Sequence, residues 1–216
     1  MARIALTVLL PVLFLAHCAM ASPAALSHEQ ALQALAGANV ESRREAAKRL
    51  GEVGVMRDVP ALVQALRDAD ELTRDQAEQS MWQIWGRSGD PRVDELYRAG
   101  VAQMNDGELR KSVATFSRII ELDPGFAEGW NKRATLYFLL GEYRKSLADC
   151  DEVIKRNPFH FGALAGYGQI YLRLEDYEKA LKYFRRALEV NPNMAGVREE
   201  VQLIERLIEE KRRNMV

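Results

Sequence analysis

The sequence predicts an all-α protein that folds as a solenoid of helical hairpins, on three observations. No stretch shows the alternation of apolar and polar residues that marks a half-buried strand. Small and apolar residues recur every 34 residues between 91 and 194, and a second spacing of 31 residues runs through 22–90. Each unit reads as two amphipathic helices that bury their apolar faces only by stacking on neighbouring units, so about eleven helices are expected.

Residues 1–21 are predicted to be a cleaved secretory signal peptide. Arg3 provides a positive start, an apolar run follows to Ala16, and Ala19-Met20-Ala21 forms a small-x-small cleavage site. The mature chain is therefore expected to begin at Ser22. The protein is therefore expected to be exported across the inner membrane of a bacterium and to reside in the periplasm.

Two alternatives concern the same segment. An uncleaved anchor is disfavoured because the apolar run is shorter than the ~20 residues that span a bilayer. A lipoprotein anchored at Cys18 is the other alternative, although the lipid-attachment pattern requires a small residue where His17 stands. After cleavage Cys150 is the one remaining cysteine, and it is predicted to be a buried hydrophobic residue.

Residues 22–90 carry the 31-residue spacing. Ser27 begins a helix, Gln30 completes a capping box with it, and Asp58 takes the capping place one unit later. Further matching positions are Gln33–Leu35 with Gln64–Leu66, Ala46 with Ala77, Leu50 with Met81 and Val53 with Ile84. Each copy predicts one short helix, a turn and one longer helix. The stretch 43–51 followed by 60–62 resembles the short HEAT-like repeats of bacterial proteins.

A short join at 86–90 separates this region from the next. Gly86 and Gly89 end one helix, and Asp90-Pro91 begins another as N-cap and first helical residue. Trp82 and Trp85 precede the join. We predict that they seal the contact between the two arrays, which then form one rigid rod, and the alternative is that they form a binding surface.

The 34-residue spacing organises residues 91–194. Its matching sets are Pro124, Pro158 and Pro192 after the second helices, Phe116, Cys150 and Phe184 at their centres, Gly100, Ala134 and Gly168 at the close approach of two helices, Leu96, Trp130 and Leu164 at the large apolar site, and Gly107, Gly141 and Glu175 at the turns. This pattern resembles the tetratricopeptide repeat family in three copies, 93–126, 127–160 and 161–194. The resemblance implies a right-handed helical-hairpin solenoid in which the first helix of each repeat lines a concave groove.

Two positions depart from the family pattern, Gln103 in place of a tyrosine and Glu175 in place of the turn glycine.

After the third repeat, residues 195–216 are predicted to form a capping helix. Val197, Val201 and Ile204 mark its apolar stripe, and its charged residues cover the rest.

Composition and motifs exclude several function classes. Thirty basic against 31 acidic residues give a net charge of −1, which disfavours a non-specific nucleic-acid binder. The sequence carries no phosphate-binding glycine loop, no nucleophile motif and no His/Cys/Asp cluster with metal-ligand spacing. We therefore expect no catalysis, no cofactor and no metal site.

Binding is the function that the resemblance implies, with a protein or peptide partner in the groove. Amides would hold the backbone of an extended peptide, and cations would hold its carboxylates. The predicted groove residues are Tyr97, Arg98, Val101, Asn105, Asn131, Lys132, Thr135, Gly162, Gly166, Gln169 and Arg173.

The glycines of the third repeat indicate a more specific site. Gly162 and Gly166 have no counterpart among the close-approach positions, and each costs about 1 kcal/mol of helix stability relative to alanine. We interpret them as a notch in the groove, flanked by Lys132, Gln169 and Arg173, that takes a bulky side chain or backbone of the partner, with a nearby acidic group held by Lys132 or Arg173. The alternative is a tolerated, slightly frayed helix.

One specialisation of the family is testable. Co-chaperones clamp a C-terminal carboxylate with Lys, Asn, Asn, Lys and Arg at five positions. The corresponding residues here are Tyr97, Val101, Lys132, Gly162 and Gly166, and none agrees. A cytosolic chaperone adaptor is therefore disfavoured.

The sequence thus indicates a non-catalytic protein–protein interaction scaffold of the cell envelope, without a membrane span in the mature chain. Two other functions fit the same features. One is a lipid-anchored envelope assembly factor held through Cys18, and the other is a regulatory subunit of a separate envelope enzyme. The partner, the pathway and the oligomeric state are open at this stage.

Overall fold

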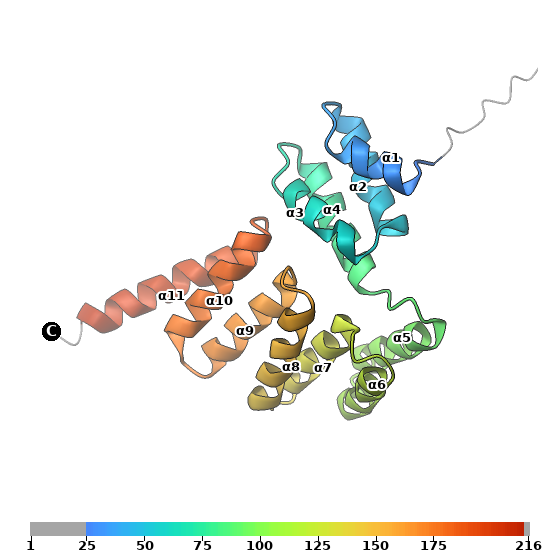
Figure 1. Ribbon diagram of the computed structural model, residues 1–216. Coiled ribbons are helices and arrows are strands. Elements are labelled where there is room, and N and C mark those ends of the chain that lie inside the picture. The colour runs from blue at the N-terminus through green and yellow to red at the C-terminus, as the bar shows by residue number, and fades with distance from the viewer. Residues whose placement is uncertain (1–24, 214–216) are drawn as a thin grey trace, which may run out of the picture.

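The computed structural model describes residues 25–213, and every regular element among them is a helix (Figure 1). The eleven α-helices agree with the number expected from the sequence, and the all-α solenoid is confirmed. The predicted signal peptide, including Cys18, and the last three residues of the chain lie outside the described residues.

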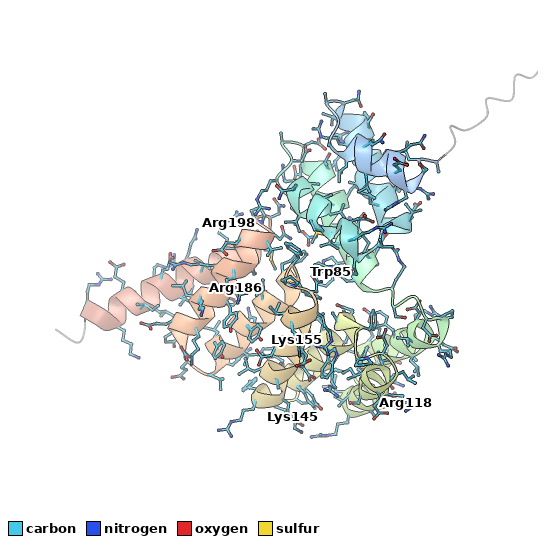
Figure 2. The ribbon with its side chains drawn as sticks, viewed as in Figure 1. Trp85, Arg118, Lys145, Lys155, Arg186 and Arg198 are labelled. Carbon is cyan, nitrogen blue, oxygen red and sulfur yellow. The ribbon has the colours of Figure 1, made fainter. Side chains whose placement is uncertain are left out.

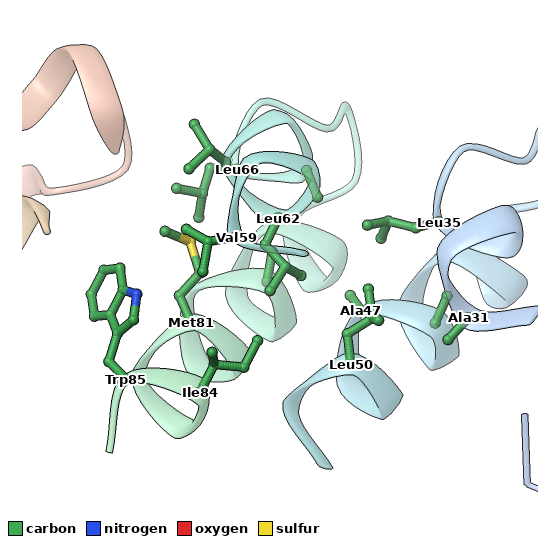
Figure 3. Close-up of a cluster of buried hydrophobic side chains, with 14 of the residues drawn as sticks. Ala31, Leu35, Ala47, Leu50, Val59, Leu62, Leu66, Met81, Ile84 and Trp85 are labelled. Atoms are coloured by element: carbon green, nitrogen blue, oxygen red, sulfur yellow. The ribbon is translucent and has the colours of Figure 1, made fainter. Parts of the chain in front are cut away.

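The N-terminal unit consists of α1 (His28–Leu35), α2 (Val40–Val53), the 3₁₀ turn η1 (Met56–Asp58), α3 (Val59–Ala65) and α4 (Glu71–Trp85). Its short helices alternate with longer ones, as the 31-residue spacing predicts. Leu50, Leu62 and Met81 are fully buried between the helices (Figure 3). The likeness to HEAT repeats stays a prediction.

Polar contacts tie the two halves of this unit together. Arg43 forms a bidentate pair with Asp68, with nitrogen–oxygen distances of 2.7 and 3.0 Å, and Arg44 pairs in the same way with Asp70. The arginine hydrogen bonds hold the pKa of Asp70 well below its usual value, despite partial desolvation. Both pairs join α2 to the loop before α4, so the loop is held against the preceding helix.

The two predicted caps behave differently. Ser27 forms the expected capping box with Gln30, in which each side chain bonds the other residue's backbone N–H. Asp58 stands at the N-cap position of α3, but its side chain makes no capping bond there. Its carboxylate instead accepts hydrogen bonds from the N–H of Val55 and from His28 Nε2, at 2.8 and 2.7 Å. The prediction that Asp58 caps α3 is therefore wrong, because η1 turns the carboxylate back toward α1.

Three helical hairpins follow, in register with the 34-residue spacing. They are α5 (Pro91–Asn105) with α6 (Leu109–Leu122), α7 (Ala127–Leu139) with α8 (Tyr143–Arg156), and α9 (Phe161–Arg173) with α10 (Tyr177–Val190). Their turns have positive φ at Gly107, Gly141 and Glu175, with values of 78°, 73° and 58°. Glu175 therefore adopts the left-handed conformation of the glycines that it replaces, at some cost in backbone strain.

The small residues lie where the pattern predicts close helix contacts. A Cβ added at Gly100 would come within 2.8 Å of the Phe116 ring, and one at Gly168 within 2.4 Å of the Phe184 ring. In the first two hairpins a serine reinforces the approach: Ser112 Oγ donates to the Gly100 carbonyl at 2.8 Å. Ser146 Oγ donates to the Ala134 carbonyl at 2.7 Å. These contacts set the packing of each first helix on its second.

The last helix, α11 (Ala195–Arg213), packs against α10. Val201 and Ile204 are buried in a cluster with Ala180 and Phe184, while the Arg185–Glu205 pair lies at the surface with a nitrogen–oxygen distance of 2.7 Å. The apolar stripe thus covers the exposed end of the third repeat, which is the role expected of a capping helix.

The N-terminal unit does not extend the repeats as a rod. In Figure 1, α3 and α4 lie over the loops that join α8 to α9 and α10 to α11. Asn193 Nδ2 donates to the Leu66 carbonyl at 2.7 Å, and Asn191 Nδ2 donates to Glu78 Oε2 at 2.9 Å. The predicted rigid rod is wrong, because the chain turns at the join, where Gly89 has φ 87°, and the curved array brings distant loops beneath α4.

Candidate functional site

Trp82 and Trp85 lie where the N-terminal unit meets the repeats (Figure 2 labels Trp85). The Trp85 ring stacks on His160 with centroids 4.4 Å apart and an interplanar angle of 20°, and the Trp82 ring meets Phe161 edge-on at 5.2 Å. The prediction that these tryptophans seal the contact between the two arrays is confirmed. The surface that they seal, however, is the start of α9 rather than the first repeat.

His160 and Glu128 form a buried polar pair beneath the tryptophans. His160 is fully buried and Glu128 is 2% exposed, with His160 Nε2 at 2.8 Å from Glu128 Oε2. The backbone N–H of Ala163 donates to His160 Nδ1 at 3.1 Å, so Nδ1 acts as acceptor and Nε2 carries the proton donated to Glu128. His160 thereby connects the N-terminus of α9 to α7.

Glu128 gathers residues from three elements. Lys132 Nζ lies 3.0 Å from Glu128 Oε1, Asn131 Nδ2 donates to both carboxylate oxygens at 3.1 and 3.2 Å, and the Tyr97 hydroxyl donates at 3.4 Å. Burial by itself would raise the pKa of Glu128, but the partners His160 and Lys132 outweigh it and lower the pKa to about 2. The carboxylate is therefore ionised and fully hydrogen-bonded inside the protein.

Sequence reasoning missed this network. No role could be assigned to His160 or Glu128 from the repeat pattern. The corresponding positions of the other repeats are Asp94 and Gly162, so the 34-residue pattern carries no signal at Glu128. The one available signal was an acid and a histidine near opposite ends of the second repeat, 32 residues apart.

Five of the predicted groove residues line one pocket of about 120 Å³ between α7 and α9. They are Asn131, Thr135, Gly162, Gly166 and Gln169. The remaining wall is largely apolar and includes Ala134, Phe138 and Cys150. Cys150 is 3% exposed, and burial raises the pKa of its thiol to about 12, so it is a buried apolar residue as predicted.

The two glycines of the predicted notch differ. A Cβ at Gly166 would meet a single neighbour, Cys150 Sγ at 3.9 Å, so the space above Gly166 is open. A Cβ at Gly162 would come within 2.6 Å of the Trp82 ring. The prediction that Gly162 lacks a packing reason is therefore wrong, because α4 lies against the start of α9. The notch is formed at Gly166.

The open space at Gly166 and the close contact at Gly168 predict opposite effects of alanine at these two glycines of α9. Gly166→Ala should raise the free energy of unfolding by up to about 1 kcal/mol, because alanine favours a helix and meets no obstacle. Gly168→Ala should lower it by about 1–3 kcal/mol, since the new methyl group overlaps Phe184. Urea denaturation followed by circular dichroism measures both. Equal effects of the two substitutions would contradict the packing described here.

The other predicted groove residues lie outside this pocket. Tyr97 and Val101 pack against the apolar cluster of the first repeat, and burial raises the pKa of the Tyr97 hydroxyl. Lys132 is paired with Glu128, which compensates its charge. Arg98, Asn105 and Arg173 are exposed. The two arginines among them, in the first and third repeats, are the predicted groove cations that are not paired with a buried carboxylate.

Within residues 25–213, no cluster of three or more His, Cys, Asp or Glu side chains has an arrangement that could hold a metal ion. Nor does that part of the chain contain a helix with the length and apolar character needed to cross a membrane.

Comparison with known proteins agrees with the geometry. A family model described as tetratricopeptide repeat matches residues 97–160 and 131–195. The sequence search against curated proteins found no match.

Solved structures resemble the repeat region at low sequence identity. The tetratricopeptide domain of Sgt2 from Aspergillus fumigatus superimposes with a TM-score of 0.54 at 22% identity, over 57% of this chain and 83% of that one. The first such domain of Spaghetti (RPAP3), bound to an HSP90 peptide, gives 0.52 at 22% identity over 54% and 92%. MamA from Desulfovibrio magneticus RS-1 gives 0.51 at 18% identity over 71% and 85%.

These likenesses establish the fold. Residues 97–195 match the tetratricopeptide repeat model, and with positive-φ turns at the 34-residue spacing they form an all-helical hairpin solenoid like that of these structures.

Proposed function

We propose that this protein is a non-catalytic interaction scaffold that binds an extended segment of a partner protein between α7 and α9. The observation that carries the proposal is the pocket at Gly166, where five predicted groove residues converge on an open helix surface. A missing side chain lets a ligand approach the α9 backbone closely, and such an approach is a recurrent reason for glycine in a helix.

The chemistry of the pocket fits a peptide side chain with its adjoining backbone. Ala134, Phe138 and Cys150 form an apolar floor. At its edge, the half-buried Gln169 amide is available to donate to and accept from a peptide group. If an apolar side chain of the peptide entered at Gly166, the peptide backbone beside it would lie within reach of that amide. Peptide-binding grooves use this combination of an apolar pocket for a side chain and a polar group for the backbone.

The pocket favours a ligand other than an acidic C-terminal peptide. The structural neighbour RPAP3 was solved with the HSP90 peptide SRMEEVD, which carries such an end. In this chain, Tyr97 and Val101 pack into the first repeat's core and Lys132 is paired with Glu128. The groove therefore offers little free positive charge at these positions, and we assign it an apolar and amide-directed specificity.

We further propose that this scaffold works in the cell envelope. Support comes from the arrangement of residues 1–21, where an apolar run precedes the small-x-small site at Ala19–Ala21. Mass measurement of the mature protein tests this: a chain beginning at Ser22 is expected. An acylated Cys18 would establish the lipid-anchored alternative, and an intact Met1 would remove the secretory proposal.

Filling the notch should weaken peptide binding. Peptides selected from a displayed random library against residues 22–216 provide the ligand, and calorimetry measures its affinity. Gly166→Leu places a large side chain in the pocket, and an overpacked contact costs about 1–3 kcal/mol, so the affinity should fall roughly 10- to 100-fold.

Gly196→Leu is the matched control. It makes the same substitution at an exposed glycine of α11, where an added Cβ meets nothing within 4 Å. The selected peptide should bind this variant like the unmodified protein. Equal affinities for the unmodified protein and Gly166→Leu would exclude the α7–α9 pocket as the binding site.

A further inference from the structure

We propose that a second pocket, lined by Trp85 and separate from the α7–α9 pocket, binds a carboxylate group. The pocket has a volume of about 220 Å³ and lies between the end of α4 and the loops that follow α6 and α8. Trp85, Arg87, Arg156 and Asn157 line it, and it shares no residue with the α7–α9 pocket.

Two residues that line this pocket each carry a buried side-chain N–H group without a hydrogen-bond partner. Trp85 is 4% exposed and Asn157 is 1% exposed, and Trp85 Nε1 and Asn157 Nδ2 are the buried side-chain nitrogens without an acceptor among the described residues. A buried donor left unpaired is unfavourable, so native proteins usually pair it with a protein group, an ordered water or a ligand. Both groups donate only, so the missing partner is an acceptor.

The next repeat shows which acceptor suits this position. Asn191 stands one repeat after Asn157 and has the same loop geometry, in which Oδ1 accepts the N–H two residues later at 3.0 Å, against 3.2 Å for Asn157. Asn191 Nδ2, however, donates to the carboxylate of Glu78 at 2.9 Å. The chain itself therefore satisfies this nitrogen with a carboxylate.

The difference between the two loops arises in α4. Glu78 and Trp85 are seven residues apart, two turns along the same face of the helix. Glu78 supplies an acceptor to the third repeat's loop, whereas Trp85 adds another donor to the pocket at the second repeat's loop. A carboxylate from outside the chain would take, beside Asn157, the place that Glu78 takes beside Asn191.

The pocket offers guanidinium groups to an anion. Those of Arg87 and Arg156 line it, together with the carboxylate of Asp123, whose Oδ1 already accepts the Gly125 N–H at 3.0 Å. Both arginines are held in place: Arg87 donates to the Gly54 carbonyl at 2.7 Å, and Arg156 donates to the Pro124 carbonyl at 2.5 Å and pairs with Glu152. Fixed guanidinium groups beside buried N–H donors are a recurrent way of holding carboxylates.

Titration of the full mature chain with sodium succinate and sodium acetate tests the proposal, with sodium chloride at equal ionic strength as reference. The Trp85 indole N–H signal in a ¹H–¹⁵N spectrum should move in a saturable manner with the carboxylates. Chloride should not move it. Absence of a saturable shift at ~100 mM carboxylate would mean that ordered water alone satisfies the two donors, which would overturn the proposal.

Asn157→Asp and Asn191→Asp form a matched pair of variants. Aspartate at 157 keeps the acceptor for the Phe159 N–H but replaces the donor with a second oxygen, so the succinate affinity should fall at least tenfold. At 191 the same change removes the bond to Glu78 and should leave the affinity within twofold. Equal binding by Asn157→Asp and the unmodified protein would overturn the assignment.

Trp85→Phe provides a test that does not depend on the fold of Asn157→Asp. It keeps an aromatic ring against His160 and removes one N–H, so calorimetry should show weaker succinate binding. Unchanged binding would contradict the role of the indole. Gly166→Leu should leave succinate binding intact, so the outcome is separate from that of the peptide-binding groove.

Two further ligands identify the source of the carboxylate. A tripeptide with a free C-terminus and its C-terminal amide differ only in that group. Binding of the acid and not of the amide assigns the site to a peptide end, and binding of succinate alone assigns it to a small free acid. Equal binding of acid and amide would overturn carboxylate recognition.

Discussion

Trp85→Ala is expected to lower the free energy of unfolding by about 3–5 kcal/mol, the range for truncation of a large buried aromatic side chain. Trp85 is 4% exposed and contacts rings from both parts of the molecule, with centroids 5.0 Å from Trp82, 4.4 Å from His160 and 5.2 Å from Phe161. Its removal leaves a cavity at the contact between the N-terminal unit and the repeats. Urea denaturation followed by far-ultraviolet circular dichroism measures the loss.

Trp130→Ala serves as the control for this substitution. Trp130 is half-buried within the second repeat, beneath the guanidinium of Arg156, and contacts no residue of the N-terminal unit in the described clusters. Its truncation should cost less. If Trp85→Ala left the stability unchanged but abolished peptide binding, the tryptophans would be a binding surface, the alternative that the sequence left open.

Glu128→Ala is expected to cost a similar amount, about 3–5 kcal/mol, because it leaves several buried donors without their acceptor and breaks the Glu128–Lys132 ion pair. His160 would lose the acceptor of its Nε2 proton, and Asn131 and Lys132 would lose theirs. Unlike the tryptophan, Glu128 contributes stability through charge, so its effect depends on pH.

The sign of that dependence follows from the lowered pKa. The pKa of Glu128 is about 2 in the folded protein against 4.5 as the ordinary value. Its contribution is therefore complete above pH 4.5 and is lost as the pH falls toward 2. Thermal unfolding of the native protein and of Glu128→Ala should show a gap in midpoint temperature that narrows over this range. The Trp85→Ala gap should not narrow in the same way, and a pH-independent Glu128→Ala gap would contradict the ionised state.

The two substitutions should also be coupled. Trp85 stacks on His160, and His160 bonds Glu128, so both variants loosen the same histidine. The double variant is expected to lose less stability than the sum of the single losses. Strict additivity of the two losses would indicate that His160 does not couple Trp85 to Glu128 energetically.

Much of the candidate site could be predicted from the repeat pattern. Asn131, Thr135, Gly166 and Gln169 meet in one pocket because residues at equivalent positions of stacked helices face the same groove. Gly162 and Lys132 depart from the prediction, since each is engaged by a residue that the pattern does not describe, Trp82 and Glu128.

The sequence by itself determined the helices, the turns and the packing of each hairpin. These depend on residues close in the chain: Gly107 and Gly141 permit the left-handed turns, and Gly100 and Gly168 admit the aromatic rings of the following helices. Such features recur every 34 residues, so repetition strengthens the signal.

Only the tertiary structure decided where the N-terminal unit lies, and with it the buried Glu128–His160 pair and the pocket at Trp85. Asn191 and Glu78 are 113 residues apart in sequence, and Asn193 and Leu66 are 127 apart. Whether such residues meet depends on small rotations between successive repeats that accumulate along the array, and on the direction taken at Gly89. No local pattern encodes that sum, so of two equivalent loop asparagines Asn191 meets Glu78 of α4, whereas Asn157 Nδ2 is left without an acceptor.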